Sequence, residues 1–335
     1  MITAKLRTMS WAIEDAFVND GADYSSEDSG AFPALITIPS DLGGLRLDLA
    51  LARLYPEHSR SRLQTWIREG WVTLDGKSVD PKQKVWGGER LRVEPEGPTE
   101  CSLDPPEDIP LSVLHEDAGL IVIDKPVGLV VHPGSGVSRG TLLNGLLHRF
   151  PELRGIPRAG IVHRLDKDTS GLLVVARTLQ AQTDLVRQLQ SRTVKRVYLA
   201  VVSGQPPEQG TVDAPIGRHP YHRTRMAVVD GGRDARTHYK VLERFDNAAL
   251  VECRLETGRT HQIRVHLAHL GHPLVGDCTY QRRKKLGPGL DDFPRQALHA
   301  RQLALVHPLS GEPLEWNSPL PKDFADLLAR LRGGG

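Results

Sequence analysis

The sequence contains none of the segments that mark a membrane protein or a secreted one. No apolar run approaches the roughly 18 residues that a membrane-spanning helix needs, and no charged and then apolar signal segment opens the chain. Cysteine is scarce, since Cys101, Cys253 and Cys278 are odd in number and include no Cys-x-x-Cys pair. The cysteines therefore predict neither a disulfide framework nor a zinc ribbon. We expect a cytoplasmic protein whose thiols are reduced.

The net charge is also small, at +2, but it is divided unevenly along the 335 residues. Residues 1–45 contain two Lys or Arg against seven Asp or Glu, so residues 46–335 carry +7. Much of this first segment is polar and acidic and cannot bury enough apolar surface to offset chain entropy, so we expect residues 1–45 to form a mobile extension. The remainder is long enough for two domains, and its basic balance could attract a polyanion.

Residues 46–95 have the pattern of a small α/β domain. Apolar residues at helical spacing predict one helix over residues 47–55 and a second around residues 63–67, which Gly70 would end. Residues 72–79 then predict two short strands that meet at an Asp-Gly turn, and residues 87–93 predict a closing strand.

The run Ser-Arg-Ser-Arg at residues 59–62 leads the second of these helices. Two helices followed by a small sheet, with basic residues at this position, resemble the S4 RNA-binding module of ribosomal proteins and RNA-modifying enzymes. The resemblance implies that Arg60 and Arg62 contact RNA. An ordinary solvated helix face is the alternative interpretation, because Lys and Arg exceed Asp and Glu by only three in residues 46–95.

Proline separates this module from the rest of the chain. Residues 96–110, together with Pro95, contain five prolines and several acidic residues, a composition that predicts an extended linker. Residues 111–335 then return to regular apolar patterns and form the second predicted domain. The patterns predict strands at 111–114, 120–124, 172–176, 195–202 and 250–255, and helices at 141–150, 180–192 and 321–331.

The segment from His163 to Ala176 concentrates charged side chains directly before a buried strand. Its polar half holds His163, Arg164 and Asp166 within a short loop, and the apolar run at 172–176 has strand length. Catalytic groups favour such loops on rigid scaffolds. Asp166 could equally be a loop residue that accepts hydrogen bonds from nearby backbone amides. The residues alone leave both interpretations open.

A second group of basic residues lies in residues 187–240, which hold ten Lys or Arg against four Asp or Glu. Within it, Arg218, Arg223 and Arg225 follow one another closely and predict a loop that faces RNA. Tyr198 precedes them in a predicted strand, where a tyrosine is more often a core residue than a functional one.

Four histidines lie within or just after the segment from Thr257 to Leu267. His261, His266, His269 and His272 invite a metal-site interpretation, but no His-Glu-x-x-His or other recognised ligand pattern accompanies them. We therefore predict no metal site here.

These segments together resemble one enzyme family. Four of them are similar to motifs of the pseudouridine synthases that act on large-subunit ribosomal RNA and some tRNAs. They are His-Arg-Leu-Asp-x-x-Thr-Ser-Gly at 163–171, Lys-Pro-x-Gly at 125–128, Arg-x-Tyr-x-Ala at 196–200 and Gly-Arg-Thr-His-Gln-Ile-Arg at 258–264. The resemblance covers residues 46 to about 331. It implies an α+β fold in which a long, bent, mainly antiparallel mixed sheet is flanked by helices and loops, with the S4 module in front.

The resemblance also implies roles for individual residues. Asp166 would be the catalytic residue, Arg264 would pair with it, and Tyr198 would pack on the uracil face. Arg164 would enter the gap that the flipped base leaves, and His163 and Arg259 would join the RNA-binding residues. No cofactor and no metal are implied.

Pseudouridine formation breaks an N-glycosidic bond and rejoins the uracil through carbon, without net redox change. A carboxylate suits this reaction because the ribose C1′ becomes electron-poor as the base leaves, as in glycoside hydrolysis. We expect Arg264 to favour the ionised carboxylate and to fix its orientation through two parallel hydrogen bonds. Whether Asp166 attacks C1′, attacks the base or lets a glycal form is left open by the sequence.

Residues 159–169 and Arg218-His-Pro resemble the subgroup of the family whose implied substrate is the helix 69 hairpin of 23S ribosomal RNA. The expected partner is that RNA or a pre-ribosomal large-subunit particle, bound by a monomer without a membrane or a small-molecule cofactor. A sister enzyme acting on other rRNA or tRNA uridines is an alternative, and a non-catalytic S4-type ribosome assembly factor is another.

Overall fold

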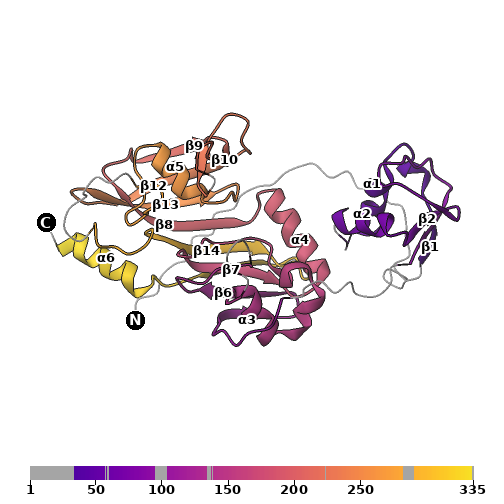
Figure 1. The fold of residues 1–335 in the computed structure, drawn as a ribbon, viewed down its shortest axis with the longest axis horizontal. Helices are drawn as coiled ribbons and strands as arrows, with labels where there is room; N and C mark the ends of the chain where they lie inside the picture. The colour runs from indigo at the N-terminus through magenta and orange to yellow at the C-terminus, as the bar shows by residue number, and fades with distance from the viewer. Residues whose placement is uncertain are drawn as a thin grey trace, which may run out of the picture.

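The computed structural model describes residues 34–56, 58, 60–94, 104–133, 137, 139–222, 224–281 and 290–333, without the side chains of residues 61 and 62. The chain folds into a small N-terminal domain and a larger C-terminal one, each with its own β-sheet (Figure 1). The predicted α+β class with an additional small domain is confirmed. No helix among the described residues is both long and apolar enough to cross a membrane.

The small domain is built from two helices and a four-stranded sheet, in which the two helices and three of the strands were predicted from the sequence. The helices pack on the sheet through Leu47, Leu51, Leu63 and Trp66, and Asp75 and Gly76 both have positive φ in the tight turn between two strands. The sheet order is β1-β4-β2-β3. The elements are β1 (Ala34–Thr37), η1 (Ser40–Leu42), α1 (Leu47–Leu54), α2 (Arg60–Arg68), β2 (Val72–Leu74), β3 (Lys77–Ser78) and β4 (Arg90–Val93).

The small domain begins earlier than the sequence predicted. Strand β1 pairs antiparallel with β4, and Ile38 and Leu42 are buried in the same core as the helices. Residues 34–45 therefore belong to this domain and not to the acidic extension. Strand β1 is an edge strand of four residues in which half-buried and exposed residues alternate, so its pattern was too short to predict it. Residues 1–33 lie outside the described residues.

The large domain is organised around a nine-stranded mixed sheet. Its order is β5-β6-β7-β14-β8-β13-β12-β9, with β15 paired to β14, and only β7 and β14 run parallel. The strands are β5 (Ser112–Glu116), β6 (Leu120–Lys125), β7 (Ser170–Ala176), β8 (Lys195–Ser203), β9 (Gln209–Asp213), β12 (Arg236–Arg244), β13 (Ala248–Leu255), β14 (Leu298–Val306) and β15 (Pro313–Asn317). The helices are α3 (Leu142–Arg149), η2 (Pro151–Gly155), η3 (Pro157–Gly160), α4 (Leu179–Gln190), α5 (Gln262–His269) and α6 (Lys322–Gly333).

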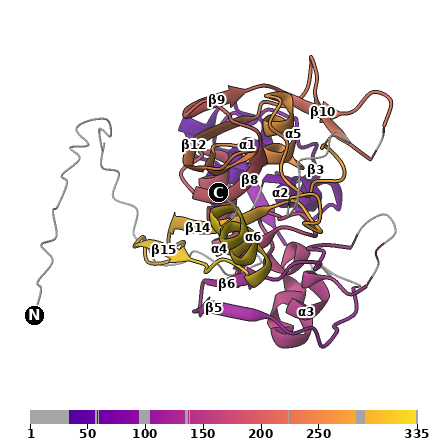
Figure 2. The same ribbon diagram turned by 90° about the vertical axis from the view of Figure 1, so that its left-hand side faces the viewer.

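Strand β7 lies at the centre of the layered core, which explains its unbroken apolar sequence. Leu173 and Val175 pack with α3 and α5 on one face of the sheet, while Leu172 and Val174 pack with α4 on the other. Every residue of β7 is buried. Figure 2 shows α3 beside β5 and β6, and α5 near β12 at the other end of the domain.

The parallel pairing of β7 with β14 explains the glycine that ends the Thr-Ser-Gly segment. Gly171 has φ +107°, and a Cβ atom there would lie 2.2 Å from the carbonyl oxygen of Ala300. Any side chain at this position would push the two central strands apart. The loop that precedes β7, which carries Asp166, is therefore held at a fixed place above the sheet.

The second half of the predicted linker packs on the large domain. The Asn144 side chain donates to the carbonyl oxygen of Pro105, the Glu107 amide donates to the carbonyl oxygen of Asn144, and Ile109 packs against the core. Residues 104–110 thus join the large domain, because Asn144 supplies the hydrogen bonds that an extended proline-rich segment cannot make internally. Residues 95–103 lie outside the described residues.

Candidate active site

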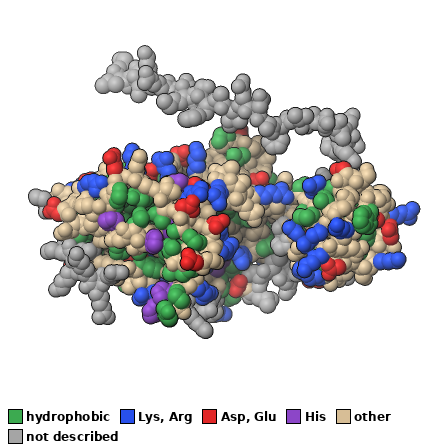
Figure 3. Space-filling view, turned by 90° about the horizontal axis from the view of Figure 1, so that it is seen from above, with side chains coloured by type: hydrophobic (Ala, Val, Ile, Leu, Met, Phe, Trp, Pro, Cys, Tyr) green, Lys and Arg blue, Asp and Glu red, His purple; other side chains and the backbone are tan. Residues whose placement is uncertain are grey.

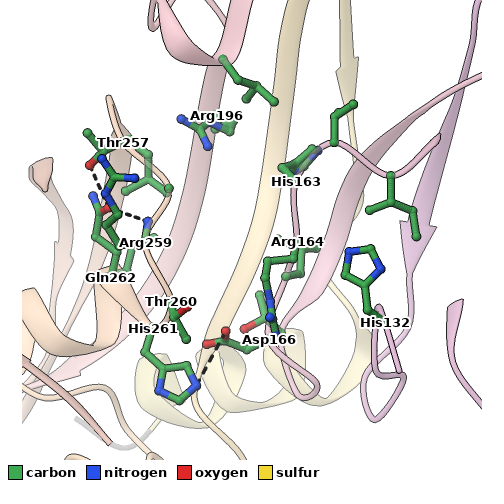
Figure 4. Close-up of a pocket in the computed structure, with 18 of the residues that line it drawn as sticks. His132, His163, Arg164, Asp166, Arg196, Thr257, Arg259, Thr260, His261 and Gln262 are labelled. Carbon is green, nitrogen blue, oxygen red and sulfur yellow. Dashed lines mark hydrogen bonds and ion pairs between the residues drawn. The ribbon is translucent and has the colours of Figure 1, made fainter. Parts of the chain in front are cut away.

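A cavity of about 1050 Å³ lies over the face of the sheet that α3 and α5 also cover. Its walls come from the loop before β7, the side chains of β8, and the segment between β13 and α5, three parts of the chain that are far apart in sequence (Figure 4). The cavity brings together Asp166, Tyr198 and Arg264 with His163, Arg164 and Arg259. Six of the predicted site residues therefore share one site.

The loop that carries Asp166 is held by a buried ammonium group. Lys125 Nζ donates to the carbonyl oxygens of Pro126 at 2.8 Å, Leu129 at 3.0 Å and Lys167 at 3.0 Å. Burial lowers the pKa of Lys125 to about 8, although the charges of Asp168 and Asp166 oppose this effect. The lysine of the Lys-Pro-x-Gly segment thus helps to fix the loop that carries Asp166.

Arg264 contacts two carboxylates, and the geometry differs from the sequence prediction. Its Nη1 donates a single hydrogen bond to Asp166 Oδ2 at 3.1 Å, while its Nε and Nη2 form the parallel pair with Asp277 at 2.7 and 2.9 Å. The predicted bidentate pairing with Asp166 is therefore wrong. Asp277 takes the fork because its carboxylate is fully buried and needs the more complete pairing, whereas Asp166 is 16% exposed toward the cavity.

The electrostatics of Arg264 follow from this arrangement. Burial alone would lower the pKa of the guanidinium, but the hydrogen bonds and charge of Asp277, followed by those of Asp166, raise it above its ordinary value. Arg264 is thus permanently charged in a largely buried place. Asp277 had no role in the sequence analysis, although it belongs to the Gly-Asp pair that follows α5.

His261 is a second residue whose place the sequence did not predict. Its Nε2 lies 3.9 Å from Asp166 Oδ1, the carboxylate oxygen that Arg264 does not bind, and its Nδ1 is 2.8 Å from the Tyr280 hydroxyl (Figure 4). Burial lowers the pKa of His261, with the charge of Asp166 opposing. Tyr280 in turn packs its ring 5.1 Å from the Arg264 guanidinium. Two side chains at the N-terminal end of α5, those of His261 and Arg264, therefore flank Asp166.

The other neighbouring histidines have separate partners. His266 lies 2.9 Å from Thr237 Oγ1, and His272 lies 2.9 Å from the Ser203 carbonyl oxygen. In the described part of the chain, no group of three or more His, Cys, Asp or Glu side chains could hold a metal ion.

Tyr198 is a core residue that also lines the cavity. It is 6% exposed, packs in the main core and lines the cavity. Burial raises the pKa of its hydroxyl, Arg196 opposes this, and Asp166 adds to it. Tyr198 is thus close enough to both charged groups to respond to each, and its aromatic ring forms part of the cavity wall.

Three other predicted residues contribute differently to the cavity. His163 accepts a hydrogen bond at Nε2 from the Val174 amide, and burial lowers its pKa to about 3, so it is a neutral support for the loop. Arg164 is exposed and lies beside Asp166 (Figure 4). Arg259 donates from Nε to the Asp234 carbonyl oxygen.

The remaining predicted RNA-binding residues lie elsewhere. Arg218 and Arg225 are exposed on the hairpin formed by β10 (Ile216–Arg218) and β11 (Met226–Val228), outside the cavity lining. Arg60 donates from Nε and Nη2 to Asp48 in the small domain. Arg223 and the side chain of Arg62 lie outside the described residues. The small domain presents several Lys and Arg side chains on the face drawn in Figure 3.

Comparison with known proteins identifies the same two parts of the chain. The RNA pseudouridylate synthase family matches residues 119–269, and the S4 domain matches residues 45–91. The chain is 57% identical over 325 residues to ribosomal large subunit pseudouridine synthase D of Nitrosomonas europaea, covering 93% of this chain and 94% of the relative. Proteins of the same name from Pseudomonas aeruginosa and Escherichia coli are 53% and 50% identical, each over 88% of this chain, and cover 94% and 93% of those relatives.

Solved structures agree with this relationship. Human RNA pseudouridylate synthase domain containing 4 superimposes with a TM-score of 0.53 at 31% identity, covering 66% of this chain and 93% of that one. Human RNA pseudouridylate synthase domain containing 1 gives a TM-score of 0.51 at 30% identity, covering 65% of this chain and 87% of that one. With its fold, its cavity and relatives that match over nearly its whole length, this chain belongs to the RNA pseudouridylate synthase family and carries an N-terminal S4 domain.

Proposed function

We propose that this protein converts uridine to pseudouridine in 23S ribosomal RNA of the large subunit, with Asp166 as the catalytic carboxylate and without a cofactor. The observation that carries the proposal is the placement of Asp166 at the cavity, where Arg264 holds one carboxylate oxygen and the other faces His261. The names of the relatives supply the substrate class. We further propose the helix 69 hairpin as the target, the subgroup's implied substrate.

The size of the cavity suits a nucleotide with its flanking linkages. At about 1050 Å³ it exceeds most pockets that take small ligands, which measure roughly 300–1000 Å³. A uridine in a hairpin must leave its stack to enter, which costs a few kcal/mol. Packing of the base on Tyr198 would return roughly 1–3 kcal/mol, and Arg164 would fill the gap left in the RNA.

The chemistry then depends on Asp166. The bond between ribose C1′ and uracil N1 breaks, the base turns in the cavity, and uracil C5 bonds to C1′. C5 then gives up its proton and N1 takes one up, so the product is an isomer of the starting uridine. A carboxylate beside C1′ serves this sequence whether it attacks C1′, attacks the base or stabilises the sugar on the way to a glycal. Arg264 positions the carboxylate, since Asp277 fixes the guanidinium from the other side.

The small domain would place the enzyme on its substrate. We propose that residues 34–94 bind structured RNA beside the target, so that the large domain acts on a nearby uridine at high effective concentration. We propose that the enzyme acts as a monomer in the cytoplasm, on the RNA or on a pre-ribosomal particle.

The test is to map pseudouridines in 23S ribosomal RNA from a strain that lacks this protein. The strain should lose pseudouridine at the helix 69 uridines and regain it when the wild-type gene is returned. Return of an Asp166→Asn gene should not restore it, while an Asp168→Asn gene, altered at another carboxylate of the same loop, should. Loss of modification at other rRNA or at tRNA uridines would assign the sister activity, and an unchanged map would reject the proposal.

A further inference from the structure

The cavity contains a buried cation that the mechanism above does not use. Arg196 is 7% exposed, lines the cavity and lies on β8 two residues before Tyr198 (Figure 4). Its one hydrogen bond among the described residues runs from Nη2 to the backbone carbonyl oxygen of Glu256 at 3.3 Å, and its buried Nε has no partner there. A buried guanidinium without an anionic partner is costly unless something else supplies the charge.

The carboxylate of Glu256, whose backbone oxygen Arg196 contacts, is already paired with other residues. Glu256 accepts from Arg192 at 2.8 Å and from Arg236 at 3.3 Å, and its other oxygen lies 2.7 Å from His238 Nε2. Its side chain is therefore taken up by Arg192, Arg236 and His238, while its backbone carbonyl oxygen accepts from Arg196. No ion pair with Arg196 is found within the described part of the chain.

The backbone is shaped to hold this guanidinium in place. A Cβ atom at Gly258 would lie 2.7 Å from Arg196 Nη1, so only glycine leaves room for the group where it sits. The Arg196 charge acts to lower the pKa of both His163 and Tyr198, since a positive charge disfavours the imidazolium and favours the phenolate. The guanidinium is thus near the ring on which the uracil would pack.

The surroundings favour an anion at this place. Seven arginines line the cavity, while its acidic lining residues are Asp104, Asp166 and Glu256. Arg264 is neutralised by Asp277 and Asp166, and Arg192 pairs with Glu256. The cavity wall around Arg196 therefore keeps an excess of positive charge.

We propose that Arg196 binds a non-bridging oxygen of an RNA phosphate, in the linkage next to the uridine whose base packs on Tyr198. The inference rests on the proposed function and adds to it a phosphate subsite inside the cavity. A phosphodiester carries the charge that the buried guanidinium lacks and accepts its planar N–H groups, which a neutral uracil carbonyl does only in part. A phosphate held this deeply fixes the register of the strand and sets the distance from C1′ to Asp166.

The experiment uses the full chain and an RNA hairpin in which single linkages around the target uridine are replaced by uncharged methylphosphonates. Dissociation constants and single-turnover rates at saturating enzyme are measured for wild type, Arg196→Gln and Lys195→Gln. Lys195 is the matched control, an exposed cation at the neighbouring position of β8 and outside the cavity lining.

In wild type, neutralising one linkage next to the target should weaken binding or slow turnover roughly 10- to 100-fold, the size expected of a hydrogen bond to a charged group. In Arg196→Gln, the same replacement should have no further effect, while replacements at other linkages keep theirs. Lys195→Gln should show the full wild-type pattern. An identical pattern in wild type and Arg196→Gln would overturn the proposal.

A second variant guards against a folding defect in Arg196→Gln. Gly258→Ala keeps the charge of Arg196 but displaces the end of its flexible side chain, so it should retain the wild-type melting temperature and lose most of the linkage effect. A full linkage effect in a folded Gly258→Ala variant whose guanidinium has moved would contradict the subsite. Failure of wild type to convert unmodified RNA would reject the proposed function, and the binding measurements would still decide whether Arg196 reads a phosphate.

Discussion

Asp48 in the small domain and Asp277 in the large domain are both fully buried and both held by arginine, yet only one lies beside a cavity. Around Asp48 the carboxylate is the hub, since it accepts from Arg60 at 2.7 Å, from Arg46 at 2.9 Å and from Gln64. All of these partners serve to satisfy one buried acid. These hydrogen bonds join α2 to the start of α1, and the Asp48 carboxylate is used entirely within them.

Around Asp277 the arrangement is reversed, because the single guanidinium of Arg264 donates hydrogen bonds to two carboxylates. Asp277 takes the bidentate pair, and Asp166 takes a single hydrogen bond while remaining 16% exposed. The comparison shows how one interaction type gives either structure or chemistry. When a buried carboxylate already binds two N–H groups of an arginine, the remaining N–H group can position a second carboxylate that stays accessible to the cavity.

The largest expected effect is that of Asp166→Asn. The amide keeps the shape of the side chain and Arg264 keeps Asp277, but C1′ loses its carboxylate, so the single-turnover rate should fall by on the order of 10⁴-fold. RNA affinity and the free energy of unfolding should stay near wild type. Rapid-quench assays of pseudouridine formation, together with thermal unfolding, check both parts.

Asp277→Asn should damage rate and stability together. Removing one partner of a buried ion pair leaves Arg264 poorly compensated, which typically costs about 3 kcal/mol of unfolding free energy. The same change frees the guanidinium to move, and a small misplacement of Asp166 can slow the chemistry roughly 100-fold. Denaturant unfolding and saturated rates measure the two losses, and a rate loss without destabilisation would mean that Asp277 acts on substrate directly.

Deletion of residues 1–95 separates the two domains. The truncated chain should bind structured ribosomal RNA roughly 10- to 100-fold more weakly and with a flatter salt dependence, because phosphate contacts of the small domain are lost. Its saturated chemical rate should remain, since Asp166, Tyr198 and Arg264 are all present. Affinity measured against salt for both lengths decides this, and an unchanged slope would remove the small domain from RNA binding.

Arg264→Lys tests whether the chemical step needs the contacts of Arg264 with both carboxylates. A point charge cannot make the fork to Asp277 and reach Asp166 at the same time, so the chemical step should slow roughly tenfold while RNA affinity changes less. Pre-steady-state kinetics separate the two quantities. An unchanged chemical step with weaker binding would reassign Arg264 to contact with phosphate.

The smallest effect is the acid sensitivity of the small domain. Burial would raise the pKa of Asp48, but hydrogen bonds from Arg60, Gln64 and Arg46 together lower it below the usual 3.8. Because the pKa of Asp48 is lower in the folded than in the unfolded state, ionised Asp48 stabilises the fold at pH values above its unfolded-state pKa. That stabilisation is lost as the pH falls through the folded-state pKa. Fluorescence of Trp66 and Trp71 should therefore report loosening of the small domain below about pH 4 in wild type. The titration should be weaker in Asp48→Asn.

The sequence predicted elements that carry a strong local signal. The apolar run of β7, the helix α3 and the Asp75-Gly76 turn follow from short-range patterns and were found within a few residues of their expected bounds. Asp166 was also found where its motif placed it, beside Arg264. Local spacing and a long motif were sufficient for these features.

Features that depend on distant contacts were not predictable. Strand β14 lies at the centre of the sheet, but Arg301 and Gln302 interrupt its apolar pattern, and its parallel pairing with β7 joins segments far apart in sequence. Asp277 and His261 gained their roles only when α5 was folded against the loop of Asp166. No sequence spacing could show that Arg264 makes its bidentate hydrogen bonds with Asp277.

The most direct test compares Asp166→Asn with Asp48→Asn in the full chain, measuring for each the saturated single-turnover rate of pseudouridine formation in 23S ribosomal RNA and the unfolding of its domain. The expected patterns are opposite: Asp166→Asn loses the rate and keeps the fold, whereas Asp48→Asn keeps the saturated rate and loses stability in the small domain. Substantial pseudouridine formation by a folded Asp166→Asn variant would contradict the assignment of Asp166 as the catalytic carboxylate.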